Sequence, residues 1–116
     1  MIASPEIDRH FDGKTPEIRA IYDAILAAAK KLGAVQEDPK KTSIHLNRRT
    51  AFLGIATRKA ALVLTVKSDG PWLHPLIVKS EQLSARRWHH DLKLTDPNQI
   101  DDEVLSHMAS AYEMSA

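Results

Sequence analysis

The 116-residue chain contains no cysteine, which excludes a disulfide framework, a thiolate nucleophile and a zinc site built on cysteine. Only four residues are glycine, and the chain has no phosphate-binding loop, no dinucleotide-binding turn and no catalytic-serine elbow. No window approaches the ~18 consecutive apolar residues of a membrane-spanning helix, and the N-terminus lacks the apolar core of a secretory signal. We therefore expect a cytoplasmic protein.

Aromatic residues are also scarce, at 5% of the chain, but the hydrophobic fraction of 43% and the charged fraction of 27% are ordinary for a globular protein. The length suits one core and is too short for two independently stable ones. The sequence therefore predicts a loosely held lead-in over residues 1–13 and a single domain over residues 14–116.

The formal net charge of +1 conceals an uneven distribution of charge along the chain. Residues 40–93 contain eleven Lys and Arg against three Asp and Glu, while the two ends together contain five basic and twelve acidic residues. Such a division of charge bears on partners and association rather than on fold.

Two segments have the pattern of amphipathic helices. Thr15-Pro16-Glu17 supplies an N-cap hydroxyl, a proline at the first helical position and an acid in the first turn, and Gly33 ends this helix. A second helix begins near Asp101 and runs to the end of the chain. Between them, short runs rich in β-branched and aliphatic residues predict strands over 42–48, 51–57, 61–67 and 87–95, with a weaker strand over 76–79.

The short connections between these strands favour antiparallel pairing. The predicted fold class is α+β, an antiparallel meander sheet of four to six strands with an N-terminal and a C-terminal helix packed on one face. Alternation turns Leu62, Leu64 and Val66 toward the helices and leaves Ala61, Val63, Thr65 and Lys67 on the open face.

The open face is also expected to carry apolar side chains. If Phe52 points at the helices, Leu53 and Ile55 point away from them. Because an exposed apolar patch often marks a contact surface, Leu53, Ile55 and Val63 are candidates for a homodimer face.

Several short motifs recur in the order and spacing of a known family. They are Phe11-x-Gly13-Lys14, Leu32-Gly33, Lys40-Lys41-Thr42-x-Ile44, Phe52, Arg87-x-x-His90-x-Leu92-x-Leu94, Asp102-Glu103-Val104 and Ala111-Tyr112. Together they resemble the bacterial domain-of-unknown-function family numbered 5655, over about residues 11–113. The resemblance implies a small α+β cytoplasmic domain and brings no activity, cofactor or catalytic residue. Its most family-like positions are Lys41, Thr42, Phe52, Arg87, His90 and Tyr112.

The adjacent histidines of 84-SARRWHHDLKLTD-96 cannot share a site, because successive strand residues point to opposite faces. Leu92 and Leu94 place His90 on the helix side, where a hydrogen-bonded core histidine is the favoured interpretation, and leave His89 on the open face. The other histidines are scattered without metal-ligand spacing, so we expect no metal site and no cofactor.

Basic side chains on the open face give the strongest functional indication. The candidate anion-binding residues are His45, Arg49, Arg87, His89 and Lys93, which converge only if their strands are neighbours. A solvated basic face offset by acidic helices is an equally weighted alternative.

Three functional hypotheses follow, in descending order. The first is a non-enzymatic binding or protein-interaction module that pairs with itself and accepts an anionic small molecule or an acidic protein. The second is nucleic-acid binding by the same face, against which the modest sequence pI of 8.1 and few aromatics count. The third is an acid–base enzyme centred on His90.

Overall fold

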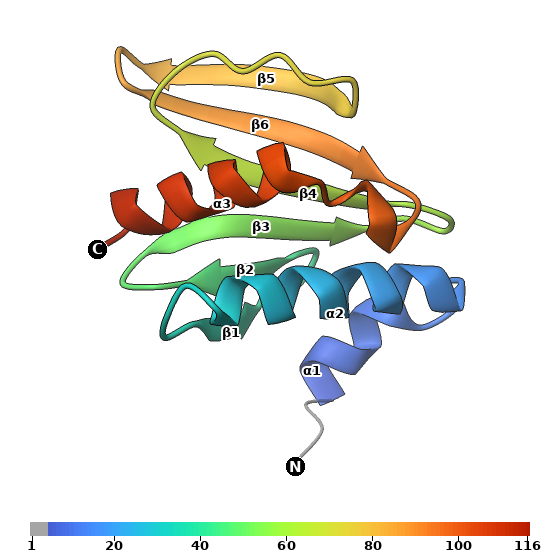
Figure 1. Cartoon of the computed structure of the whole chain (residues 1–116). Coiled ribbons are helices and arrows are strands. Elements are labelled where there is room, and N and C mark those ends of the chain that lie inside the picture. Colours follow the sequence, from blue (N-terminus) through green and yellow to red (C-terminus); the bar gives the residue numbers. More distant parts are fainter. Residues whose placement is uncertain (1–4) are drawn as a thin grey trace.

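The computed structural model describes residues 5–116, which form helices packed against one antiparallel sheet (Figure 1). The helices are α1 (Pro5–Asp8), α2 (Pro16–Lys30) and α3 (Asp102–Met114), with the 3-10 turns η1 (Arg9–Phe11) and η2 (Pro97–Gln99). The strands are β1 (Gln36–Pro39), β2 (Ile44–Asn47), β3 (Ala51–Thr57), β4 (Leu62–Ser68), β5 (Ile77–Ser84) and β6 (Arg87–Leu94). The α+β class with two main helices near the chain ends is confirmed.

The six strands lie in the order β1-β2-β3-β4-β6-β5, and every pair is antiparallel. Consecutive strands pair as far as β4, but β6 then takes the place beside β4 and β5 lies outside it at the sheet edge. The weak strand predicted over 76–79 is the beginning of β5, which continues to Ser84.

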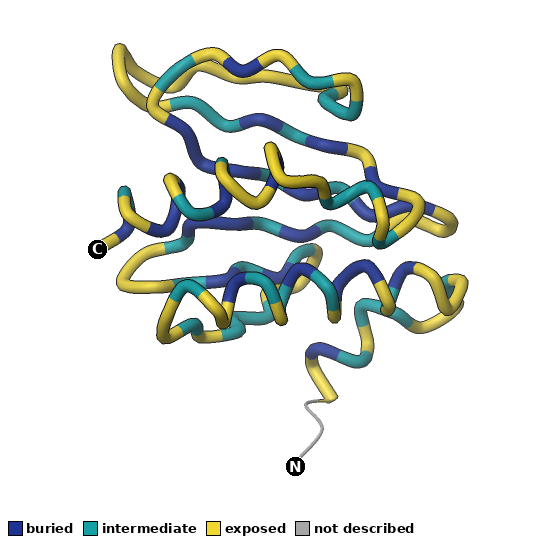
Figure 2. The backbone as a smooth tube through the Cα atoms, in the orientation of Figure 1, coloured by how far each residue is buried: buried dark blue, intermediate teal, exposed yellow. Residues whose placement is uncertain are grey.

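Helices α2 and α3 cover the same face of the sheet, as Figure 1 shows. Their buried stripes follow the predicted three- and four-residue spacing and comprise Ile18, Ile21, Tyr22, Ile25 and Ala29 in α2, and Val104, Met108, Ala111 and Tyr112 in α3. The sheet contributes every second residue, and the buried positions alternate along the strands in Figure 2. Within residues 5–116, no helix has the length and apolar character needed to cross a bilayer.

A β-bulge corrects the prediction for β3. Leu46 pairs with Leu53, but Asn47 pairs with Ala51, so Phe52 is the extra residue of the bulge. The bulge lets Phe52 and Leu53 both turn inward, and they are 1% and 2% exposed. Leu53 and Ile55 are therefore core residues that pair inside the sheet, and their predicted position on the open face is wrong.

The lead-in over residues 1–13 is also more structured than predicted. Residues 1–4 lie outside the described residues, but residues 5–11 form α1 and η1 and pack on the sheet end. Ile7 is buried in the core, and the His10 carbonyl accepts a 2.6 Å hydrogen bond from the Thr57 hydroxyl. His10 Nε2 also lies 2.9 Å from the Lys40 carbonyl oxygen. These contacts fix the segment that leads into α2.

Gly33 follows α2 at a position that excludes a side chain. Its φ is +148°, and a Cβ at this residue would lie 2.5 Å from the Tyr112 hydroxyl oxygen, which donates a 2.9 Å hydrogen bond to the Ala34 carbonyl. We expect Gly33→Ala to lower the free energy of unfolding, measured in urea, by about 2 kcal/mol or more. Gly13→Ala is the control, because Gly13 also has positive φ but has open space around its Cβ position. Equal losses in the two variants would show that the contact with Tyr112 is unimportant.

Candidate functional site

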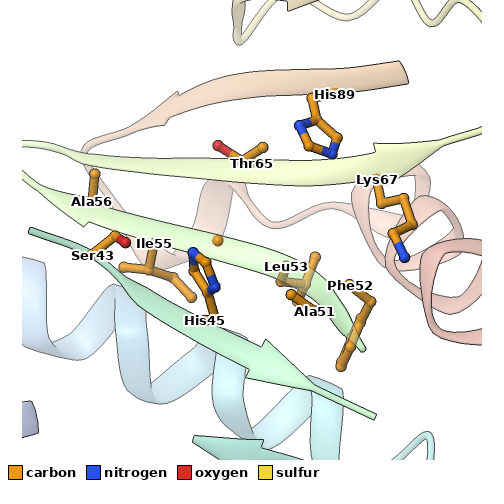
Figure 3. A pocket seen from close by; sticks show the side chains of 11 residues that line it. Ser43, His45, Ala51, Phe52, Leu53, Ile55, Ala56, Thr65, Lys67 and His89 are labelled. Carbon is orange, nitrogen blue, oxygen red and sulfur yellow. The ribbon is translucent and has the colours of Figure 1, made fainter. Parts of the chain in front are cut away.

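An open hollow of about 260 Å³ lies on the face of the sheet opposite the helices (Figure 3). Its lining comes from four neighbouring strands and the turn before β2, and comprises Ser43, His45, Ala51, Phe52, Leu53, Gly54, Ile55, Ala56, Thr65, Lys67 and His89. The floor is formed by β3, which contributes small residues (Ala51, Gly54 and Ala56) together with the buried residues Phe52, Leu53 and Ile55. Polar side chains from β2, β4 and β6 stand around it.

Gly54 keeps this floor low. It pairs with His45 on one side and with Thr65 on the other, so those two side chains flank a position that has none. A Cβ on Gly54 would lie 3.5 Å from Thr65 Cβ and 4.0 Å from His45 Cδ2, which is ordinary van der Waals contact. The glycine is therefore not required by packing, and its effect is to leave room between the two side chains.

Lys67 forms one end of the hollow. Its side chain is buried, at 8% exposure, and the ammonium donates hydrogen bonds to the hydroxyls of Ser115 (2.8 Å) and Thr50 (3.3 Å). Both partners are neutral, and among residues 5–116 no carboxylate lies within ion-pairing distance of this ammonium. Ser115 follows α3, so the partial negative charge of a helix C-terminus compensates part of the lysine charge.

His89 lies directly opposite Lys67 in the register of β4 and β6. Side chains in such pairs have Cβ atoms roughly 5 Å apart, and, in addition to burial, the positive charge of Lys67 contributes to lowering the pKa of His89. Burial lowers the pKa of Lys67, and the positive charge of Arg87 lowers it further. Burial also lowers the pKa of His89, against the opposing effect of Glu81 and Asp91. Both groups are therefore partly desolvated, and this environment disfavours their protonated, positively charged forms unless an anion lies nearby.

The next row of cross-strand partners, which runs from Asp38 through Gly54 to Asp91, is more acidic than the row that contains Lys67 and His89. Asp91 accepts a 2.7 Å hydrogen bond from the Thr65 hydroxyl, and Asp38 at the far side pairs with Lys40 at 2.9 Å. The Lys40 ammonium lowers the pKa of Asp38. The face is thus cationic at the Lys67 end and mixed in charge over Gly54, which suits a ligand with a single anionic end.

Two of the five predicted anion-binding residues, His45 and His89, line the hollow. Their strands are not neighbours, because β3 and β4 lie between β2 and β6, so the condition for their convergence is not met. Three strand spacings separate the two histidines by roughly 14 Å, too far for one small ion to reach both.

The other three predicted residues lie outside the hollow, and all are exposed. Arg49 is in the turn between β2 and β3, where its backbone N–H donates to the Ser115 carbonyl at 3.1 Å. Arg87 begins β6 and acts on Lys67 and His89 only through its charge. Lys93 lies opposite Val63, which is half-buried on the open face as predicted.

Sequence reasoning did not select Lys67 and Thr65 as site residues, although strand alternation had placed both on the open face. The signal was available: Lys67 continues the alternation of β4 beside apolar residues, in a strand that is otherwise nearly free of charge. Nothing in the pattern of a single strand indicates that the hydroxyl of Ser115, 48 positions later, accepts a hydrogen bond from the Lys67 ammonium.

His90 lies in the core, as its strand parity predicts, and is fully buried. Its Nε2 lies 2.9 Å from the Gly70 carbonyl and its Nδ1 2.8 Å from the Ser80 hydroxyl. A carbonyl only accepts, so Nε2–H donates to Gly70, and Nδ1 pairs with the Ser80 hydroxyl, which can donate or accept. Trp88 stacks on one side of the ring at 5.7 Å, and Trp72 meets it edge-on at 5.8 Å. Both ring nitrogens of this buried histidine therefore have hydrogen-bond partners, and the ring faces the core rather than the hollow.

The remaining family-like positions divide between core and surface. Phe52 packs edge-to-face on Tyr112 with ring centroids 5.1 Å apart, which joins β3 to α3. Lys41 and Thr42 are exposed in the turn before β2. Among residues 5–116 no group of three or more His, Asp or Glu side chains is arranged to hold a metal ion.

Comparison with known proteins gives a family without a described activity. No curated protein and no solved structure matches the chain. The family described as Domain of unknown function (DUF5655) matches residues 7–115, which includes every strand, both main helices and the whole hollow. On this match over nearly its full length, the chain belongs to the DUF5655 family.

Proposed function

We propose that this domain is a non-enzymatic binding module that holds an elongated organic anion in the hollow on the open sheet face. The anionic end, a carboxylate or a phosphate monoester, contacts the Lys67 ammonium and the His89 imidazole. The apolar body lies along β3 over Gly54, toward His45.

One observation carries this proposal: the ammonium of a buried lysine, with only neutral hydrogen-bond partners, forms the end of an open hollow. Taking a charge out of water is costly unless an opposite charge compensates it. The C-terminal end of α3 supplies part of that compensation, and a bound anion supplies the rest. Two of the three ammonium hydrogens are used by Ser115 and Thr50, which leaves one for the ligand.

The open face supports an anionic ligand better than the other partners considered. A homodimer through this face loses its apolar basis, because Leu53 and Ile55 are in the core. Nucleic acid requires a continuous basic track, whereas Asp38 and Asp91 interrupt this face and Arg49 lies apart from it.

Isothermal titration calorimetry with four probes tests the proposal: inorganic phosphate, phenyl phosphate, benzoate and phenol. We expect binding of phenyl phosphate and benzoate, weaker binding of phosphate and none of phenol, because both the charge and the apolar body contribute. Gly54→Val fills the floor without altering charge and keeps a residue that favours strands, so it should abolish phenyl phosphate binding. Ala60→Val in the exposed turn before β4 is the matched control. Absence of binding by both organic anions, or unchanged binding to Gly54→Val, would refute the proposal.

Anion affinity should depend on pH through His89. Burial lowers the pKa of His89 in the free domain, and an adjacent anion favours the imidazolium and raises that pKa. Binding therefore takes up protons, and the affinity should rise as the pH falls from about 7.5 through the ordinary histidine pKa of about 6.5. Calorimetry in two buffers with different ionisation enthalpies measures this uptake directly. His89→Asn should remove it, and an affinity that falls on acidification would contradict the assigned contact.

A further inference from the structure

The outer edge of the sheet at β5 is unusually open. β5 bonds to β6 along one side, and no other strand within residues 5–116 covers its second side. Every β5 residue except Ile77 is exposed, and exposed residues are yellow in Figure 2. An uncovered edge presents unpaired backbone N–H and C=O groups that can pair with another strand.

Exposed apolar side chains also occur on β5 and in the loop before it. Leu73 (94% exposed), in the loop before β5, and Val78 (62%) and Leu83 (50%), on the strand, are the most exposed large apolar side chains among the described residues.

The charged side chains of β5 are self-complementary when a two-fold axis at Ser80 relates two copies of the strand. Lys79 and Glu81 flank Ser80 and lie on the same face, since they pair with Asp91 and His89 of β6. When two β5 strands run antiparallel about a two-fold axis at Ser80, each Lys79 faces the partner's Glu81. An axis at Lys79 or at Glu81 brings two like charges together instead, which is unfavourable in directly opposed pairs.

We propose that two copies of this chain associate through antiparallel pairing of their β5 edges, centred on Ser80. The paired sheet then continues from one copy to the other. Bulges at Ile77/Lys79 and Gln82/Ser84 limit the regular edge to its central residues, so the dimer is weak and depends on protein concentration. Since both copies use the same edge, association closes at two chains.

Charge exchange combined with sedimentation velocity over a range of protein concentrations tests this register. Lys79→Glu and Glu81→Lys each create two like-charge pairs in the dimer and should weaken association by about tenfold. The double variant Lys79→Glu/Glu81→Lys restores two opposite-charge pairs and should return to the wild-type association constant. Lys59→Glu, in the exposed turn before β4, is a control for net charge.

Thermal unfolding of each variant shows whether the exposed substitutions leave the fold intact. Recovery in the double variant together with losses in both single variants would establish the Ser80-centred pairing. A wild-type chain that stays monomeric at the highest concentration overturns the proposal. So does a double variant that associates no better than the single ones. Glu81 lies opposite His89, and its charge raises the His89 pKa against the lowering effect of burial, but neither Lys79 nor Glu81 lines the hollow. Association is therefore measured without an anion, and either result leaves the anion-binding proposal to its own test.

Discussion

Replacing Trp72 with alanine should lower the free energy of unfolding by about 3–5 kcal/mol, the range of buried Trp and Phe truncations. The Trp72 ring stacks on His107 with centroids 3.7 Å apart and meets His90 edge-on. Its Nε1–H donates a 2.6 Å hydrogen bond to Glu103. The residue thus joins the segment between β4 and β5 to α3, and its loss opens a cavity at that junction and removes the hydrogen bond.

Urea unfolding followed by circular dichroism measures this change, and Trp88→Ala is the matched control. Trp88 is half-buried, and its described ring contact is stacking on His90. Trp88→Ala should therefore lower the free energy of unfolding clearly less than Trp72→Ala does. Trp72→Phe keeps most of the packing but loses the bond to Glu103, and we expect an intermediate loss. Equal losses for Trp72→Ala and Trp88→Ala would contradict the assignment of the junction to Trp72.

Replacing Lys67 with methionine should weaken binding of phenyl phosphate by about 100-fold while leaving the fold intact. The substitution removes the one buried cation of the hollow and keeps an unbranched apolar chain of similar length. A charge-assisted hydrogen bond to a partly desolvated anion contributes about 1.5–3 kcal/mol, which corresponds to roughly 10- to 150-fold in affinity.

Stability should change much less than affinity in Lys67→Met. The variant loses hydrogen bonds to Ser115 and Thr50 but also loses the cost of a buried charge, and these effects oppose each other. Lys93→Met removes an exposed lysine from the same face and should retain nearly full affinity. A Lys67→Met protein that folds and binds as tightly as wild type would exclude Lys67 as the anion contact.

The predictable parts of the fold were those with a regular local pattern. The apolar stripes of α2 and α3 and the alternation of β6 identified the buried rows and separated His89 from His90. By contrast, the inward turn of Leu53 depends on a bulge between β2 and β3, a feature of pairing that one strand does not reveal. β5 is exposed along nearly its whole length, so its sequence has no apolar alternation from which the C-terminal end of the strand could be predicted.

The candidate site was only partly predictable because it depends on strand order. Local alternation correctly placed His45 and His89 on the open face. It did not reveal that two strands lie between them in the sheet. His89 is opposite Lys67 because β6, and not β5, lies beside β4 in the sheet. The residue that follows α3, Ser115, accepts a hydrogen bond from the Lys67 ammonium. These are contacts between distant parts of the chain, which residue spacing does not encode.

Chemical-shift mapping by nuclear magnetic resonance, with phenyl phosphate titrated into the ¹⁵N-labelled domain, tests the central claim most directly. We expect saturable shifts concentrated at Gly54, Thr65, Lys67 and His89, with none along the helix-covered face. Shifts confined to the turns at Arg49 or Lys41, or no saturable shift at all, would contradict a binding site on the open face of the sheet.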